Sequence, residues 1–256
     1  MRRATLCAVA VLVVGLWPGD GAAQDAQPDF SGVYYPIRRF GGPAGGQDVA
    51  DPDAPPPPPT RSAPTSDGRD GRPADAPKLT PEYLARWEVM RASRMAGSSE
   101  FDPSARCLST GMPAMMNMVY GMEVMQAADR ITMYSELNDM YRRIFLDGRE
   151  PSAEVLVDPT YAGYSTGRWE GDTLVVETVA LRADTLLDDF SPHSAQMTVR
   201  ERIRLVEPDL LEDRITVFDP VALEEPYEVV KQYRRAVPPD DELREFACAE
   251  GLDTAK

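Results

Sequence analysis

The sequence predicts a mainly β protein in which about 8–10 antiparallel strands form an up-and-down barrel or a sandwich, together with one amphipathic helix. From Gly121 onward, short runs rich in β-branched and aromatic residues are separated by turn sequences such as Asp147-Gly148-Arg149 and Glu170-Gly171-Asp172. Connections this short indicate antiparallel neighbours. The chain has 256 residues, of which 43% are hydrophobic, so it can bury one sizeable core.

The first 23 residues are typical of a signal peptide for export. Arg2 and Arg3 supply its positive charge, and the apolar run from Leu6 to Trp17 is too short to cross a bilayer as a helix. Small residues at positions 21–23 precede a cleavage site. We therefore expect a periplasmic or secreted protein with no membrane insertion after cleavage. The alternative is an N-terminal membrane anchor.

Composition divides the rest of the chain into three parts. Residues 24–39 hold a first strand, and residues 40–77 form a tract with ten Pro and six Gly. Because this tract has few apolar side chains to offset the entropy of ordering, we expect a disordered linker. A ligand for a proline-recognising partner is the alternative. Residues 78–250 are expected to form the barrel domain.

The helix is expected over residues 80–96. Thr80 can cap its first turn, and Pro81 occupies a position where proline is tolerated. Tyr83 and Trp87 lie one turn apart and share an apolar face. This face is expected to pack against the sheet.

Ten strands are expected, one before the linker and nine after Gly121. They span residues 31–36, 121–127, 130–136, 140–146, 162–169, 173–180, 196–206, 211–219, 227–236 and 243–247.

Three charged residues, Glu201, Asp213 and Lys231, fall on the apolar and therefore inward faces of consecutive late strands. A three-residue hairpin connection places Asp213 opposite Ile203. Arg143 shares the alternation of its aromatic neighbours and is expected inside as well. Because an unpaired buried charge is costly, these groups need partners, water or a cavity. They either orient a ligand inside a barrel or form a structural ion pair, unless a bulge turns them outward.

Several further residues are candidates for the same site. His193, the single histidine, lies in the loop before the Glu201 strand. It could act as a general acid or base with Glu201 or Asp213, or be a solvated bystander. Met116 belongs to a methionine-rich stretch, whose soft side chains suit either an apolar ligand surface or an irregular core plug. Tyr233 and Trp169 are also expected to contact the ligand.

Cysteine and charge content narrow the possible partners. Export leaves Cys107 and Cys248, and two thiols in an oxidising compartment favour a disulfide over two unpaired buried thiols. The formal net charge of −15 argues against nucleic acid. One histidine, no cysteine pair at ligand spacing and no phosphate-binding or dinucleotide motif indicate no metal and no cofactor. The sequence does not indicate an oligomeric state.

Four segments carry a resemblance to a known family. They are PDFSGVY at 28–34, RCL at 106–108 with GMP at 111–113, RRIFLDGR at 142–149 and GRWEGDTLVV at 167–176. Over about 28–40 and 78–250 the chain resembles a large family of secreted bacterial proteins of unknown function. The resemblance implies an exported domain and singles out the His193 loop and Glu201.

A more distant resemblance concerns the first strand. Gly32-Val33-Tyr34 is similar to the Gly-x-Trp start of calycin barrels, the lipocalins and their relatives, with Tyr in place of Trp. This resemblance implies an up-and-down barrel with an apolar ligand cavity. It also implies that an arginine of the last strand, Arg234 or Arg235, packs over Tyr34.

These observations give three hypotheses. The first is an exported barrel protein that binds a small, largely apolar molecule, oriented by Glu201, Asp213, Lys231 and Arg143. The second is an enzyme on the same barrel that performs acid–base chemistry, as an isomerase, cyclase, lyase or hydrolase. The third is an envelope interaction or scaffold module.

Overall fold

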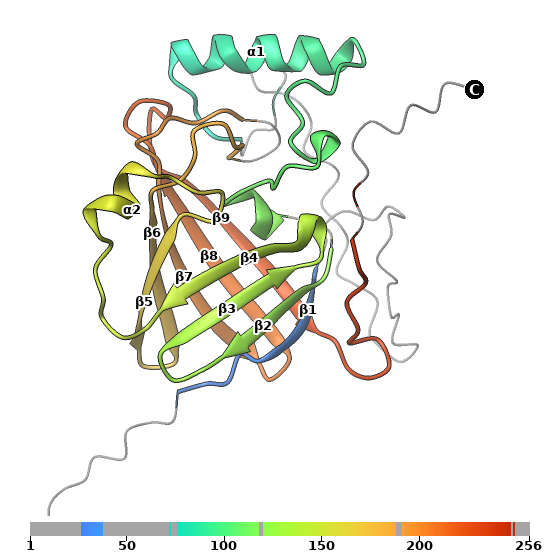
Figure 1. Cartoon of the computed structure of the whole chain (residues 1–256), viewed down its shortest axis with the longest axis vertical. Helices are drawn as coiled ribbons and strands as arrows, with labels where there is room; N and C mark the ends of the chain where they lie inside the picture. The colour runs from blue at the N-terminus through green and yellow to red at the C-terminus, as the bar shows by residue number, and fades with distance from the viewer. Residues whose placement is uncertain are drawn as a thin grey trace, which may run out of the picture.

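Alternating apolar side chains, separated by turn residues, produce a closed barrel (Figure 1). The computed structural model describes residues 27–37, 72, 76–117, 120–187, 191–246 and 248. Nine strands lie side by side in chain order within these residues, and the last pairs with the first. They are β1 (Gly32–Pro36), β2 (Met122–Gln126), β3 (Arg130–Ser135), β4 (Met140–Phe145), β5 (Tyr164–Glu170), β6 (Thr173–Val179), β7 (Thr198–Glu207), β8 (Leu210–Phe218) and β9 (Tyr227–Arg235). The predicted fold class is confirmed.

The expected strand bounds are correct to within two residues, with one exception. The tenth strand, expected over 243–247, is wrong, because residues 241–246 form no strand. The reason is that β1 pairs with both β2 and β9, so the closed barrel has no free edge for another strand.

One strand pair departs from the antiparallel pattern. β4 and β5 run parallel, with Ile144 opposite Ser165 and Phe145 opposite Thr166. A parallel pair needs a connection that returns the chain to the same end of the barrel. Residues 146–163, which include the short helix α2 (Ala153–Val157), provide that return.

The helix α1 (Pro81–Met95) crosses one end of the barrel, as Figure 1 shows. Its buried residues Tyr83 and Trp87 belong to the hydrophobic core. The Thr80 hydroxyl donates to the carbonyl of Val221 at 3.0 Å instead of capping the helix. This bond anchors α1 to the loop that follows β8.

Two aromatic residues near the start of the barrel, Tyr34 of β1 and Phe30 just before it, contact residues of other strands. Arg235 of β9 lies 5.3 Å from the centre of the Tyr34 ring and donates two hydrogen bonds to its hydroxyl, at 2.9 and 2.7 Å. Gly32 allows this approach, since a Cβ there would meet Arg235 at 3.2 Å. The arginine expected from the calycin resemblance is therefore present. Phe30 is fully buried and packs on Trp169 with ring centres 5.1 Å apart.

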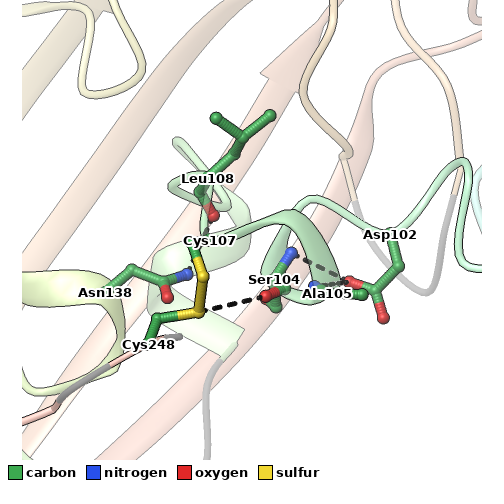
Figure 2. The surroundings of a disulfide bond; sticks show 7 residues. All are labelled: Asp102, Ser104, Ala105, Cys107, Leu108, Asn138 and Cys248. Atoms are coloured by element: carbon green, nitrogen blue, oxygen red, sulfur yellow. Dashed lines mark hydrogen bonds between the residues drawn. A yellow bond between two sulfur atoms is a disulfide. The ribbon is translucent and has the colours of Figure 1, made fainter. Parts of the chain in front are cut away.

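A disulfide joins Cys107 to Cys248, as predicted, with the two Cα atoms 5.6 Å apart (Figure 2). It ties the segment after α1 to the C-terminal part of the chain, 141 residues later. A disulfide indicates an oxidising, extracytoplasmic setting.

The predicted signal peptide lies outside the described residues, as does nearly all of the predicted linker over 40–77. The division into those segments therefore stays a prediction. Within the described part of the chain, no helix has the length and apolar character needed to span a membrane.

Candidate functional site

A buried ion pair lies inside the barrel, between Arg142 of β4 and Glu201 of β7. Both side chains are 0% exposed, and the guanidinium donates to both carboxylate oxygens, one contact measuring 2.7 Å. Arg142 also donates to the hydroxyls of Ser165, at 3.2 Å, and Thr178, at 2.9 Å. This fork of donors links four strands and compensates for burying the two charges.

Glu201 faces inward as predicted, whereas the prediction for Arg143 is wrong. Arg143 is exposed, and Arg142 points into the barrel instead. The prediction assumed that Tyr141 and Phe145 mark the inner face, but both rings lie outside, where Tyr141 stacks on Tyr134. The inner face of β4 is marked instead by Met140 and Ile144, which are buried. Aromatic residues are thus poor markers of the inner face when they can pair across neighbouring strands.

Asp213 of β8 lies opposite Ile203 of β7, in the predicted register, and opposite Lys231 of β9. At the end of the hairpin, a three-residue connection predicts Val206 opposite Leu210, but a bulge at Val206 pairs Glu207 with Leu210 instead. Asp213 is fully buried, and no donor among the described residues reaches either carboxyl oxygen. Burial, then the negative charge of Glu201 and a hydrogen bond shared with its carboxylate, raise the pKa of Asp213 well above its ordinary value. The neutral acid is therefore the favoured form.

The raised pKa of Asp213 gives a prediction for stability. The native state holds this proton more tightly than the unfolded chain does, so Asp213 contributes most to stability below the unfolded pKa of about 3.9. That contribution is lost as the pH rises through the native pKa. Compared with Asp213→Asn, the wild-type protein should therefore become progressively less stable between about pH 4 and pH 7. Urea denaturation of both proteins across this range measures the difference, and a pH-independent difference would contradict the assignment.

A plug, defined as residues 111–116, is buried at the barrel end that α1 crosses. Met116 is 1% exposed, and its carbonyl accepts a hydrogen bond from the Tyr233 hydroxyl of β9. Tyr233 is itself buried, and burial raises the pKa of its hydroxyl well above the ordinary value. The methionine-rich stretch therefore contributes a core plug, one of its two predicted roles.

Beneath the plug lies a void of about 10 Å³, enough for a single water molecule. Lys231, which is half-buried, lines this void together with apolar residues of β8, β9 and the covering loops. The apolar lining residues are Pro113, Leu187, Ile215, Val217, Tyr227 and Val229. The void thus has apolar walls, with one ammonium group among its lining residues.

His193 is buried rather than solvated, at 2% exposure. Its Nδ1 lies 2.9 Å from the carbonyl of Ser194, and its Nε2 lies 2.8 Å from the hydroxyl of Thr185. Burial lowers the pKa of the imidazole, which favours the neutral ring, and Nδ1 donates to the Ser194 carbonyl. Asp219 accepts hydrogen bonds from both the backbone and the hydroxyl of Ser194. These contacts hold the loop before β7, and no hydrogen bond in the described structure joins His193 to Glu201 or Asp213.

The predicted site residues fall into separate groups. Five of them lie inside the barrel, namely Glu201, Asp213, Lys231, Tyr233 and Met116. Three further inward residues were not predicted from the sequence, namely Arg142, Ser165 and Thr178. The hydroxyls of Ser165 and Thr178 lie 2.9 Å apart. The alternation of side chains along these two adjacent strands could have predicted that both hydroxyls point inward. Trp169 shares the inward alternation of Ser165 on β5 and packs on Phe30.

A larger cavity, of about 300 Å³, lies beside α2. Its lining contains Glu154 and Asp158, together with Tyr164 of β5. None of the predicted site residues lines this cavity.

Comparison of the chain with known protein families and with curated proteins found no match. The resemblance to secreted bacterial proteins therefore stays a prediction, whereas the closed barrel itself is shown.

Proposed function

We propose that this protein is exported and binds a small, largely apolar molecule in the barrel, between the plug and the buried polar cluster. The main support is Asp213, a fully buried carboxyl group whose oxygens meet no hydrogen-bond donor among the described residues. The neutral acid can donate its O–H to Glu201, but its carbonyl oxygen is left without a donor. A buried acceptor without a donor is costly, so a ligand that donates to it would explain its retention in the wall of β8 and β9.

The inner wall of β8 and β9 supports this proposal. Val217 lies opposite Tyr227, and Ile215 lies opposite Val229, so two successive apolar pairs precede the pair of Asp213 and Lys231. Apolar walls with a few polar groups at one end are typical of small-molecule sites.

Entry of a ligand requires the plug to move, because the void beneath it holds only one water. Methionines 112, 115 and 116 are buried in the plug, and their unbranched side chains can repack around different shapes. The hydrogen bond from Tyr233 to Met116 is a specific contact that opening must break. We therefore place the entrance at the α1 end of the barrel.

The test uses N-phenyl-1-naphthylamine, a neutral apolar dye that fluoresces in apolar surroundings. The wild-type protein is expected to bind one dye molecule per barrel. Val229→Trp, which fills the lumen, should weaken binding at least about tenfold through overpacking of the site. The matched control is Val230→Trp, because alternation turns Val230 to the outside of the same strand and its dye affinity should stay at the wild-type value.

Circular dichroism establishes that each variant is folded. If Val229→Trp does not fold, Val229→Phe gives the same comparison with a smaller side chain. Absence of dye binding by the wild type would overturn the proposal, and so would equal affinities of the inward and outward variants.

A further inference from the structure

We propose that the cavity beside α2 is a second binding site, which takes a small organic amine in its protonated form. The inference goes beyond the proposed function, because this cavity shares no lining residue with the void beneath the plug. Its volume of about 300 Å³ lies at the small end of the range for ligand pockets, which is about 300–1,000 Å³. The cavity therefore has room for an organic body and not only for an ion.

The walls of the cavity come from α2, from the turn that follows it, and from the paired ends of β5 and β6. The lining residues are Glu154, Val155, Asp158, Thr160, Gly163, Tyr164 and Ala180. The Thr160 N–H donates to the carbonyl of Ala180 at 3.0 Å, and the Thr160 carbonyl accepts from Arg182 at 3.1 Å. A Cβ at Gly163 would meet the carbonyl of Val179 at 2.7 Å, so glycine is needed for the turn to pack this closely. These backbone contacts form the cavity before any ligand binds.

Two carboxylates line the cavity without a partner. Glu154 and Asp158 are four residues apart, a spacing that places two side chains on one face of a helix with Cβ atoms about 5–6 Å apart. Within the described residues, neither carboxylate makes a hydrogen bond or an ion pair. Arg182, whose charge acts on Asp158, is itself bonded to Asp184 at 2.8 Å. Like charges at this spacing repel, so a cation between the two carboxylates would stabilise this part of the chain.

An aromatic ring completes the lining. Tyr164 packs on Phe145 with ring centres 5.2 Å apart, and the Arg149 guanidinium lies 4.2 Å from the centre of the Phe145 ring. This stack holds the Tyr164 ring in place beside the cavity. The face of an aromatic ring attracts a cation, and Val155 and Ala180 add apolar contact area.

The chemical class of the ligand follows from this lining. A protonated primary amine has three N–H donors, so one head group can donate to both carboxylates. Its positive charge matches the two negative charges of the lining, and an apolar body can contact Tyr164 and Val155. A metal ion fits less well, because the described residues contain no group of three or more acidic, histidine or cysteine side chains that could hold one.

The test compares three small molecules that share one phenylethyl body and differ in the head group, namely phenethylamine, 2-phenylethanol and 3-phenylpropionate. Isothermal titration calorimetry at neutral pH and low salt measures the affinity of the wild-type protein for each. Phenethylamine should bind at least about fivefold more tightly than 2-phenylethanol, since its ammonium can pair with two partly solvated carboxylates. The anion 3-phenylpropionate should bind most weakly. Added salt should weaken the binding of phenethylamine and leave that of 2-phenylethanol unchanged, because salt screens exposed charges.

Variants locate the site. Glu154→Gln and Asp158→Asn each remove one charge at nearly constant size, and each should reduce the preference for phenethylamine over 2-phenylethanol. The double variant should abolish it. The matched control is Asp172→Asn, which removes an exposed carboxylate at the opposite end of the β5–β6 hairpin and should retain the preference. Val229→Trp, which fills the barrel, should retain it as well.

The outcomes separate this inference from the proposed function. Equal affinities of the wild type for phenethylamine and 2-phenylethanol would overturn the inference, and so would a preference that survives the double variant. Calcium binding that is tighter than phenethylamine binding and is lost in the double variant would assign the cavity to a metal ion and overturn it too. Loss of phenethylamine binding in folded Val229→Trp would place the amine in the barrel instead. The proposed function is decided by dye binding alone, so either proposal can fail without the other.

Discussion

Replacing Glu201 with alanine is expected to lower the free energy of unfolding by about 3–5 kcal/mol, because it leaves the Arg142 guanidinium buried without its counter-charge. This loss is a large part of the total stability of an ordinary domain, which is about 5–15 kcal/mol. Urea denaturation, followed by circular dichroism, measures the change.

Two controls test the physical reason. Glu177→Ala removes an exposed ion pair with Arg200, whose side chains are 50% and 54% exposed, and should cost at most about 1 kcal/mol. The double replacement Arg142→Met with Glu201→Leu removes both charges together. It should recover most of the lost stability, since apolar residues of similar volume can replace a buried ion pair. A loss of under about 1 kcal/mol for Glu201→Ala would show that water or another group compensates for Arg142.

Removal of the disulfide is expected to have a similarly large effect. The bond closes a loop between residues that are 141 positions apart, and the chain-entropy account then assigns it roughly 4–5 kcal/mol. The double variant Cys107→Ser with Cys248→Ser should therefore unfold at a much lower urea concentration than the wild type.

The single variants provide the control for this prediction. Because either substitution already breaks the same bond, Cys107→Ser, Cys248→Ser and the double variant should have nearly equal stabilities. Wild-type protein treated with a thiol reductant should match all three. Additive losses from the two single variants would contradict the pairing, and an unchanged stability would show that the bond closes no loop in solution.

Local chemistry was sufficient to predict most of the barrel. Turn residues at positions 147–149 and 170–172 mark the ends of strands, and their bounds followed from the pattern. The register of β7 against β8, with Ile203 opposite Asp213, followed from alternation and loop length alone. These features depend on residues that are close in the sequence, so a single chain carries the information.

The candidate site was only partly predictable. Alternation placed Glu201 and Asp213 inside correctly, because aliphatic residues flank both. The same rule failed at Arg143, where the aromatic neighbours Tyr141 and Phe145 pack on the outside of the barrel. Which face of β4 is buried depends on partners from β3 and β5, and these partners are brought together only by folding.

The sequence by itself determined the strands, their alternation and the two cysteines available for a bridge, since each of these depends on residue type and short spacing. Only the tertiary structure decided that Arg142 is the partner of Glu201, that the plug occupies one end of the barrel, and that the oxygens of Asp213 meet no hydrogen-bond donor among the described residues. The physical reason is that these contacts join side chains that are distant in the chain. Barrel closure brings β4, β7 and β8 around one interior, and a local pattern cannot specify which of their polar groups meet there.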